Sequence, residues 1–225
     1  MLTVFDLIAV LWFVFLWGGY TLLAKRKART VSCLSFELRR KRTDWMQQML
    51  SRDNKIADVT LLSALERNVA FFASSSLLIL AGLLTALASS HSISEVLSYL
   101  TPWASQNKET IQVKILFLAV IYVFTFFQFT WSLRQYGFGG VLIGAAPDGR
   151  EMTAQEQALY ANRTAKVIDQ AGHSFNYGLR SMYFSLAALA WFIDSSLFMA
   201  TSVIVLLVMK HREFHSKALK ALQEC

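Results

Sequence analysis

The chain has 225 residues, of which 55% are hydrophobic and 16% are charged, and its formal net charge is +7. This length suits one compact bundle and leaves little room for a separate soluble domain. Cys33 and Cys225 are the two cysteines, which excludes a disulfide framework and gives no metal-ligand spacing. The basic residues flank apolar stretches, so we interpret the positive charge as a topology signal and predict no nucleic-acid partner.

Four long stretches of the chain are almost free of ionisable residues. They cover residues 2–24, 69–89, 115–133 and 182–209. Each is long enough to cross a bilayer core, which needs about 20 apolar residues. The sequence predicts an all-α integral membrane helical bundle of four transmembrane helices, forming a single membrane domain over residues 1–225. The loops at about 25–68 and 134–181 are predicted to form long cytoplasmic helical extensions.

The distribution of Lys and Arg predicts an orientation. The first loop holds 11 of them, the third loop five, the second loop two and the carboxyl-terminal tail four. With loops one and three in the cytoplasm, 16 lie inside and six outside, as the positive-inside rule favours. The first span lacks the basic start of a cleaved signal peptide, so we expect a retained anchor with its amino terminus outside. We therefore predict an integral protein of a bacterial inner membrane, with anionic membrane lipids as partners.

The first loop is predicted to contain two helices. Between Ser32 and Ser51 the apolar residues recur at helical spacing, and the opposite face carries the basic run Arg39–Arg42. Such a helix lies on the membrane surface or packs on other cytoplasmic helices, and both arrangements remain open. Asn54 is a suitable cap for a second helix, which would start near Ile56 and continue into the second span.

The third span and the third loop each carry one notable feature. Gln128 lies within the third span, where its amide needs a partner from another helix, from water or from a pore. In the third loop, Thr153 and Glu156 have the spacing of a capping box. Small residues then recur at heptad-like spacing up to Gly172, which predicts close packing against the first-loop helix or against another subunit. We expect a homo-oligomer.

The fourth stretch is interrupted by Asp194, Ser195 and Ser196. If the chain reversed there, Arg180 and Lys210 would lie on the same side, but each leg of about 14 residues would reach only about 21 Å. A single long or kinked span is therefore the preferred prediction, and a re-entrant or five-segment arrangement is the alternative. Asp194 is an intramembrane polar candidate for proton or ion coupling if it lies deep, and a solvated or helix-capping acid if it lies near the outer interface.

Polar residues also gather where three spans meet the predicted cytoplasmic interface. These candidates for binding an anion or a lipid head group are Arg67, Asn68, Arg134, Gln135, Asn176 and Arg180. If the three arginines converge, they form one site for a phosphate. If they point outward, they contact only bulk lipid phosphates.

We predict no catalytic residue, metal or cofactor. Nothing in the chain links a nucleophile, a base and an orienting acid, so an enzyme is the least favoured class. His211 and His215 share the spacing of metal ligands, but only two ligands are visible and a basic amphipathic tail is the better interpretation.

Five phrases of the sequence resemble a known family. They are Arg67–Leu80, Phe129–Tyr136, Ile143–Pro147, Phe175–Phe184 and Arg212–Ser216. In combination they resemble the bacterial and plant membrane proteins of domain-of-unknown-function family 599, over nearly the whole chain. The resemblance implies a four-span architecture and carries over no catalytic role.

The sequence favours a homo-oligomeric channel or transporter-like assembly of unknown solute. This hypothesis rests on the polar groups within spans, the small-residue faces and the lack of a catalytic domain. The alternative is an anionic-lipid-binding membrane scaffold or accessory subunit without transport or catalysis.

Overall fold

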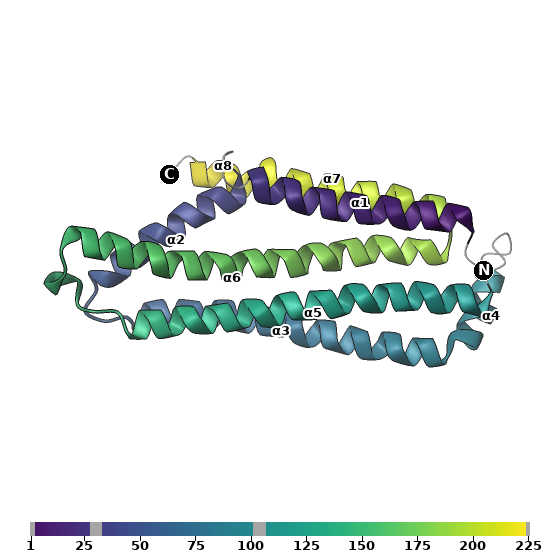
Figure 1. The fold of residues 1–225 in the computed structure, drawn as a ribbon, viewed down its shortest axis with the longest axis horizontal. Coiled ribbons are helices and arrows are strands. Elements are labelled where there is room, and N and C mark those ends of the chain that lie inside the picture. Colours follow the sequence, from purple (N-terminus) through teal and green to yellow (C-terminus); the bar gives the residue numbers. More distant parts are fainter. Residues whose placement is uncertain (1–2, 28–32, 101–106, 224–225) are drawn as a thin grey trace.

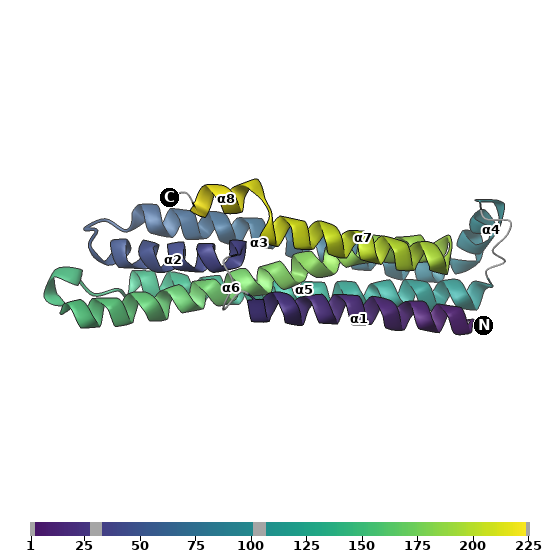
Figure 2. The same ribbon diagram turned by 90° about the horizontal axis from the view of Figure 1, so that it is seen from above.

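The computed structural model describes residues 3–27, 33–100 and 107–223, and every regular element in these ranges is helical. The α-helices are α1 (Val4–Lys27), α2 (Leu34–Leu50), α3 (Ile56–Ala88), α4 (Ser90–Leu100), α5 (Lys108–Gly144), α6 (Ala154–Leu189), α7 (Ser195–Phe214) and α8 (Lys217–Gln223). Two short 3-10 helices, η1 (Gly149–Glu151) and η2 (Ala190–Phe192), flank α6. The long helices run side by side along one axis (Figures 1 and 2), which confirms the predicted all-helical fold.

Three of the described helices are long and apolar enough to cross a membrane: Val4–Ala24 of α1, α3 and α5. On α5, Arg134 follows Lys114 by 20 residues, which corresponds to about 30 Å of helix and matches the thickness of a hydrocarbon core. We call the part of the bundle between the levels of these two residues the membrane half.

Two further names describe the bundle. The Asp6 end of the membrane half is the end at which α1 begins, and the Lys210 end is the opposite one. Beyond the Lys210 end lies the extension, which consists of α2 and residues 56–66, 135–144 and 154–174 of α3, α5 and α6.

The prediction of one continuous span over residues 182–209 is wrong. Helix α6 ends at Leu189, η2 turns the chain, and α7 runs back antiparallel to α6. Contacts between them follow this reversal, since Thr201 Oγ1 donates to the carbonyl oxygen of Ala187 at 3.3 Å. Lys210 thus returns to the end where Arg180 lies, as in the alternative arrangement.

Helices α6 and α7 form a helical hairpin, and both extend beyond the charge-free stretch of residues 182–209. Helix α6 begins in the extension, and α7 continues through its charged residues to Phe214 over 20 residues, or about 30 Å. Sequence reasoning took the absence of charge as the limit of each helix, and that assumption made the legs look too short to cross.

Residues from α1 and α5 satisfy the polar groups exposed at the break. Lys114 Nζ donates to the carbonyl oxygen of Trp191 at 2.6 Å. Asp6 accepts from Trp191 Nε1 at 2.9 Å and from Ser195 Oγ at 2.5 Å. Helix ends leave unsatisfied backbone groups, which are costly to bury, and the network stabilises the reversal by pairing them.

The interior divides into two apolar cores. The core of the membrane half includes Phe13, Phe184, Trp191 and Phe198, all fully or almost fully buried. The second core contains Met46 and Met49 of α2 and small residues of α6, and it reaches from the extension into the membrane half as far as Phe129.

The small-residue seam of α6 lets α2 approach closely. At Gly172 an added Cβ would lie 2.7 Å from the guanidinium of Arg42, so that glycine leaves the room that Arg42 occupies. The first-loop helix is therefore a partner of the seam within this chain, and α2 packs on the other helices of the extension.

Candidate functional site

The side chain of Arg180 lies inside the bundle and is 11% exposed. Its guanidinium carbon lies 5.3 Å from the ring centroid of Tyr20 and 5.7 Å from that of Tyr177, within cation–π range. Its nearest carboxylate is that of Glu213, with 4.0 Å between Nη2 and Oε2. Glu213 also accepts from the backbone N–H of Ser35 at 3.2 Å, so α1, α6, α7 and the start of α2 meet here.

Arg180 is also deep in the membrane half. It precedes Trp191, which lies beside Lys114 at the Asp6 end, by 11 residues, or about 17 Å of helix. The Cα atom of Arg180 therefore lies near the middle of the membrane half. Its long side chain brings the charge towards the Lys210 end. An ionisable residue at this depth is by default a functional candidate.

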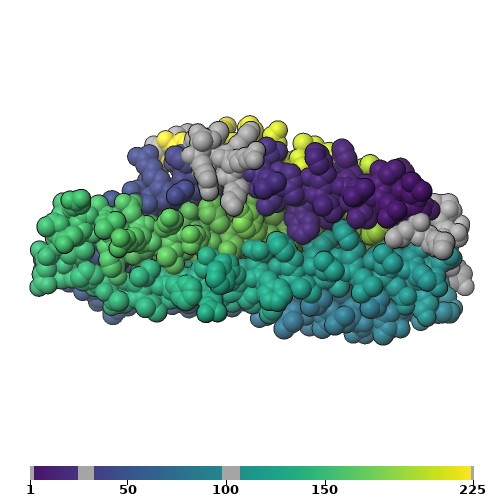
Figure 3. Space-filling model, viewed as in Figure 1, coloured from purple at the N-terminus to yellow at the C-terminus, as the bar shows by residue number. Residues whose placement is uncertain are grey.

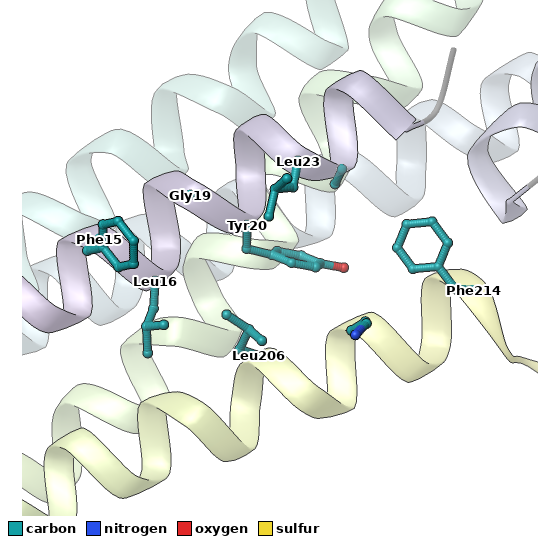
Figure 4. Close-up of a pocket in the computed structure, with 9 residues that line it drawn as sticks. Phe15, Leu16, Gly19, Tyr20, Leu23, Leu206 and Phe214 are labelled. Carbon is teal, nitrogen blue, oxygen red and sulfur yellow. The ribbon is translucent and has the colours of Figure 1, made fainter. Parts of the chain in front are cut away.

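A cleft of about 270 Å³ separates α1 from α7 near this arginine. It is lined by Phe15, Leu16, Gly19, Tyr20, Leu23, Ala24, Leu206, Lys210 and Phe214. Figure 4 shows the ring of Tyr20 projecting between the two helices, with Leu206 and Phe214 on the facing helix. Lys210 is exposed and forms no salt bridge within the described part of the chain. We call this hollow the α1–α7 cleft.

A second hollow of about 440 Å³ lies on another side of α1. Its lining residues are Trp17, Gly18, Thr21, Leu22, Phe124, Gln128 and Tyr177, from α1, α5 and α6. Figure 3 shows the purple surface of α1 beside the teal surface of α5 on one face of the molecule. We call this hollow the α1–α5 groove. The structure thus places the predicted candidate Gln128 in a groove rather than in the packed core.

Aromatic contacts hold α1 in place towards the Asp6 end. Phe13 packs against Phe198 at 5.1 Å and against Phe184 at 5.5 Å between ring centroids. Trp17 meets Phe124 edge to face at 5.5 Å. Beyond these contacts, an added Cβ at Gly18 or Gly19 would meet no atom within 4 Å. The paired glycines therefore leave open space at both hollows instead of providing close helix contact.

The family model described as "Protein of unknown function, DUF599" matches residues 8–218. The chain belongs to the DUF599 family. This confirms the resemblance found in the sequence. Searches of curated proteins and of solved structures found no match.

The other predicted site residues of this DUF599 protein have separate surroundings. Arg67 and Asn68 are exposed on α3, and exposed Arg134 lies over the ring of Phe138 at 5.7 Å. No contact that the structure describes joins Arg67 or Arg134 to Arg180, so a site shared by three arginines stays a prediction. The level of an arginine along the bundle can be read from its sequence spacing. The direction of its side chain depends on how its helix is rotated about the helix axis.

Three more candidates have partners or positions that favour structural roles. Gln135 is buried and its Oε1 accepts from Ser174 Oγ at 3.0 Å. Asn176 is half-buried on α6, one residue before Tyr177. Asp194 is exposed and caps α7, accepting from the backbone N–H groups of Ser196 and Leu197 at 2.7 and 3.2 Å. The helix-capping alternative for Asp194 is the one that this geometry supports.

Part of the basic run on α2 is engaged inside the extension. Arg42 donates to Asp169 at 2.8 Å, and Arg39 and His173 also lie within ion-pair range of that carboxylate. Burial alone would raise the pKa of Asp169, but the hydrogen bond from His173 and the nearby positive charges together lower it below its usual value. Arg40 and Lys41 remain exposed, so only part of this run is available to a partner.

Sequence reasoning missed Asp6 and Lys114. Both are almost fully buried, at 7% and 3% exposed, although each looks in the sequence like an ordinary charge at the edge of a span. Only an indirect signal in the sequence could have found these two residues. The pattern Asp194-Ser195-Ser196 is typical of a helix start, and a helix starting there requires partners for the break before it.

Proposed function

We propose that this DUF599 protein is an integral membrane protein that binds an anionic lipid in the α1–α7 cleft. The observation that carries the proposal is an apolar cleft within the membrane half whose lining includes the ammonium group of Lys210, which has no salt bridge to a described residue. Apolar walls suit an acyl chain, and a cation beside them suits a phosphate head group.

The orientation that we propose puts the Lys210 end in the cytoplasm of a bacterial cell, at the inner membrane. The α6–α7 reversal supports it, because the basic tail then lies at the same end as loops one and three. In that arrangement all of the 22 Lys and Arg residues except Lys108 and Lys114 belong to the cytoplasmic side. This asymmetry is stronger than the one counted from a four-span topology.

Arg180 supplies a second positive charge behind the cleft. Its separation of 4.0 Å from Glu213 is long for an ion pair, and a guanidinium has five N–H donors. Tyr20, whose ring lies beside Arg180, lines the cleft. A lipid phosphate near Lys210 would therefore lie in a positive field with a hydroxyl group at hand.

We favour lipid binding over the channel or transporter-like assembly because the expected polar groups do not line up. Asp194 caps α7 near the level of Lys114, whereas Gln128 follows Lys114 by 14 residues on α5, or about 21 Å away along the axis. A path for a solute would require further polar groups between them. The scaffold alternative therefore becomes the leading proposal, with homo-oligomer formation still a prediction.

The test compares lipid retention by two charge-removing variants. The protein is purified from bilayers that contain phosphatidylglycerol and phosphatidylcholine, and the retained lipids are quantified. Lys210→Gln should weaken phosphatidylglycerol retention about fivefold, since one basic residue at the surface contributes roughly 1 kcal/mol.

Lys217→Gln is the matched control, because it removes the same charge from exposed helix α8. It should leave retention unchanged. Equal losses in both variants, or no preference for phosphatidylglycerol in the unmodified protein, would contradict the proposed site.

A further inference from the structure

The α1–α5 groove differs in chemistry from the α1–α7 cleft. Its lining contains no acidic or basic residue, whereas the cleft contains Lys210. The two hollows lie on different sides of the same helix, and neighbouring glycines open into them, Gly18 into the groove and Gly19 into the cleft. They are therefore suited to different ligands.

Gln128 is a polar group in the groove for which the described residues provide no hydrogen-bond partner. It forms no hydrogen bond with any other residue in the described ranges, whereas Thr21 Oγ1 in the same groove donates to the carbonyl oxygen of Trp17 at 2.8 Å. Two helical turns farther along the same side of α5, Gln135 is bonded to Ser174. An amide left unpaired in hydrocarbon is costly, so the occupant of the groove must offer a hydrogen-bonding group.

The depth of Gln128 restricts the kind of occupant. It precedes Arg134 by six residues, which places its Cα about 9 Å inside the hydrocarbon boundary. A charged head group drawn to this depth would lose its hydration, which is strongly unfavourable. An uncharged lipid with a hydroxyl or ester group can sink to this level without that cost.

The groove also has the shape of a site for a lipid chain. Its volume of about 440 Å³ lies within the range of small-molecule sites. In the lining, Trp17 of α1 packs edge to face against Phe124 of α5, and this contact closes the gap between the two helices. The other lining residues are largely apolar. An acyl chain would bury these apolar walls, while its polar end reaches the amide of Gln128.

We propose that the α1–α5 groove binds an uncharged glycerolipid of the diacylglycerol class, whose hydroxyl or ester group hydrogen-bonds to Gln128. This site is separate from the anionic-lipid site proposed for the cleft, and either can be present without the other.

The experiment uses dioleoylglycerol as the probe. The full-length protein is held in micelles of a short-chain phosphatidylcholine with increasing dioleoylglycerol, and the dioleoylglycerol that co-elutes with the protein is quantified. Retention should saturate, and Gln128→Leu should weaken it about fivefold because one hydrogen bond is lost. Gly18→Leu should block it by filling the groove, since an added Cβ there meets no atom within 4 Å.

Two control variants separate this site from the cleft and from general damage. Gly19→Leu fills the cleft, so it should lower phosphatidylglycerol retention and leave dioleoylglycerol retention unchanged. Gln112→Leu makes the same substitution on the same helix outside the groove, where Gln112 bonds to Ser90, and it should not change dioleoylglycerol retention.

Several outcomes would overturn the proposal. One is an absence of saturable dioleoylglycerol retention by the unmodified protein, and another is full retention in both Gln128→Leu and Gly18→Leu. A third is a dimer that Gln128→Leu converts to a monomer without any dioleoylglycerol bound, which would assign the groove to a second copy of the chain. Loss of phosphatidylglycerol retention alone would affect only the cleft proposal.

Discussion

The two ends of α1 have opposite surroundings within the same membrane half. At the Asp6 end, Asp6 and Lys114 are buried and bonded around Trp191, and Phe13 packs among other aromatic rings. At the Lys210 end, α1 runs between two hollows, and Lys210 has no salt bridge with a described residue. The first end is arranged for stability, and the second leaves surface for a ligand.

This difference has a general physical basis. A buried polar network contributes to stability only when all of its members are paired, and removing one member leaves the others unsatisfied. Binding surfaces, by contrast, are drawn from the less tightly packed parts of a structure. The comparison predicts that substitutions at the Asp6 end reduce stability, whereas substitutions at the Lys210 end change lipid retention.

The largest effect is expected for Asp6→Ala. The substitution leaves Trp191 Nε1 and Ser195 Oγ without their acceptor and removes a carboxylate from the network around buried Lys114. Breaking a buried charged network typically costs about 3–5 kcal/mol. Unfolding by denaturant in detergent micelles measures this loss, with Glu109→Ala on an exposed position of α5 as the control. Equal stability of the two variants would show that the Asp6 end is not the stabilising one.

A smaller effect on stability is expected when alanine replaces a glycine, and its sign should depend on whether the glycine is tightly packed or borders open space. An added Cβ at Gly178 of α6 would overlap the ring of buried Phe129, whereas at Gly18 of α1 it meets nothing within 4 Å. Gly178→Ala should therefore destabilise the protein by about 1–3 kcal/mol. Gly18→Ala should stabilise it by about 0.5–1 kcal/mol through helix propensity. The same unfolding measurement checks both, and destabilisation by Gly18→Ala would contradict the open groove.

Much of the fold could be predicted from the sequence. The charge-free stretches marked the helices of the membrane half because hydrocarbon excludes charge, and Thr153 with Glu156 marked the start of α6 through local bonds that form as expected. The reversal at Asp194 was given only as an alternative. It depends on Asp6 and Lys114, which are 108 residues apart in the chain and come together only through tertiary packing.

The candidate site was predicted in part. Gln128 stood out because a polar group within an apolar stretch is costly and therefore informative. Arg180 stood out because it lies where a predicted span meets the cytoplasmic interface. Tyr20, Lys210 and Glu213 were not connected with them, since their proximity requires the antiparallel return of α7. Spacing gave the depth of Arg67 and Arg134 but not the direction in which their side chains point.

The smallest expected loss of stability concerns the extension, which lies outside both ends. Asp169→Asn should destabilise the protein at neutral pH by about 1–2 kcal/mol, because Arg42 and His173 lose a charged partner. The pKa of Asp169 is lowered in the folded protein, so its contribution is fully present above the unfolded value of about 3.9 and is lost as the pH falls through the folded value.

Denaturant unfolding at several pH values tests this linkage. The stability difference between Asp169→Asn and the unmodified protein should stay constant above about pH 5 and shrink below about pH 4. A difference that grows on acidification would contradict the charged state assigned to Asp169. Lipid retention at neutral pH should be the same in both proteins, since this carboxylate lies in the extension.

The most direct test of the central claim is the composition of lipids retained by the protein from a bilayer of known phosphatidylglycerol and phosphatidylcholine content. The account predicts that phosphatidylglycerol is enriched over the bulk bilayer and that Gly19→Leu, which fills the α1–α7 cleft, abolishes the enrichment while Gly18→Leu preserves it. Retained lipid of the same composition as the bulk bilayer, or enrichment that survives Gly19→Leu, would contradict it.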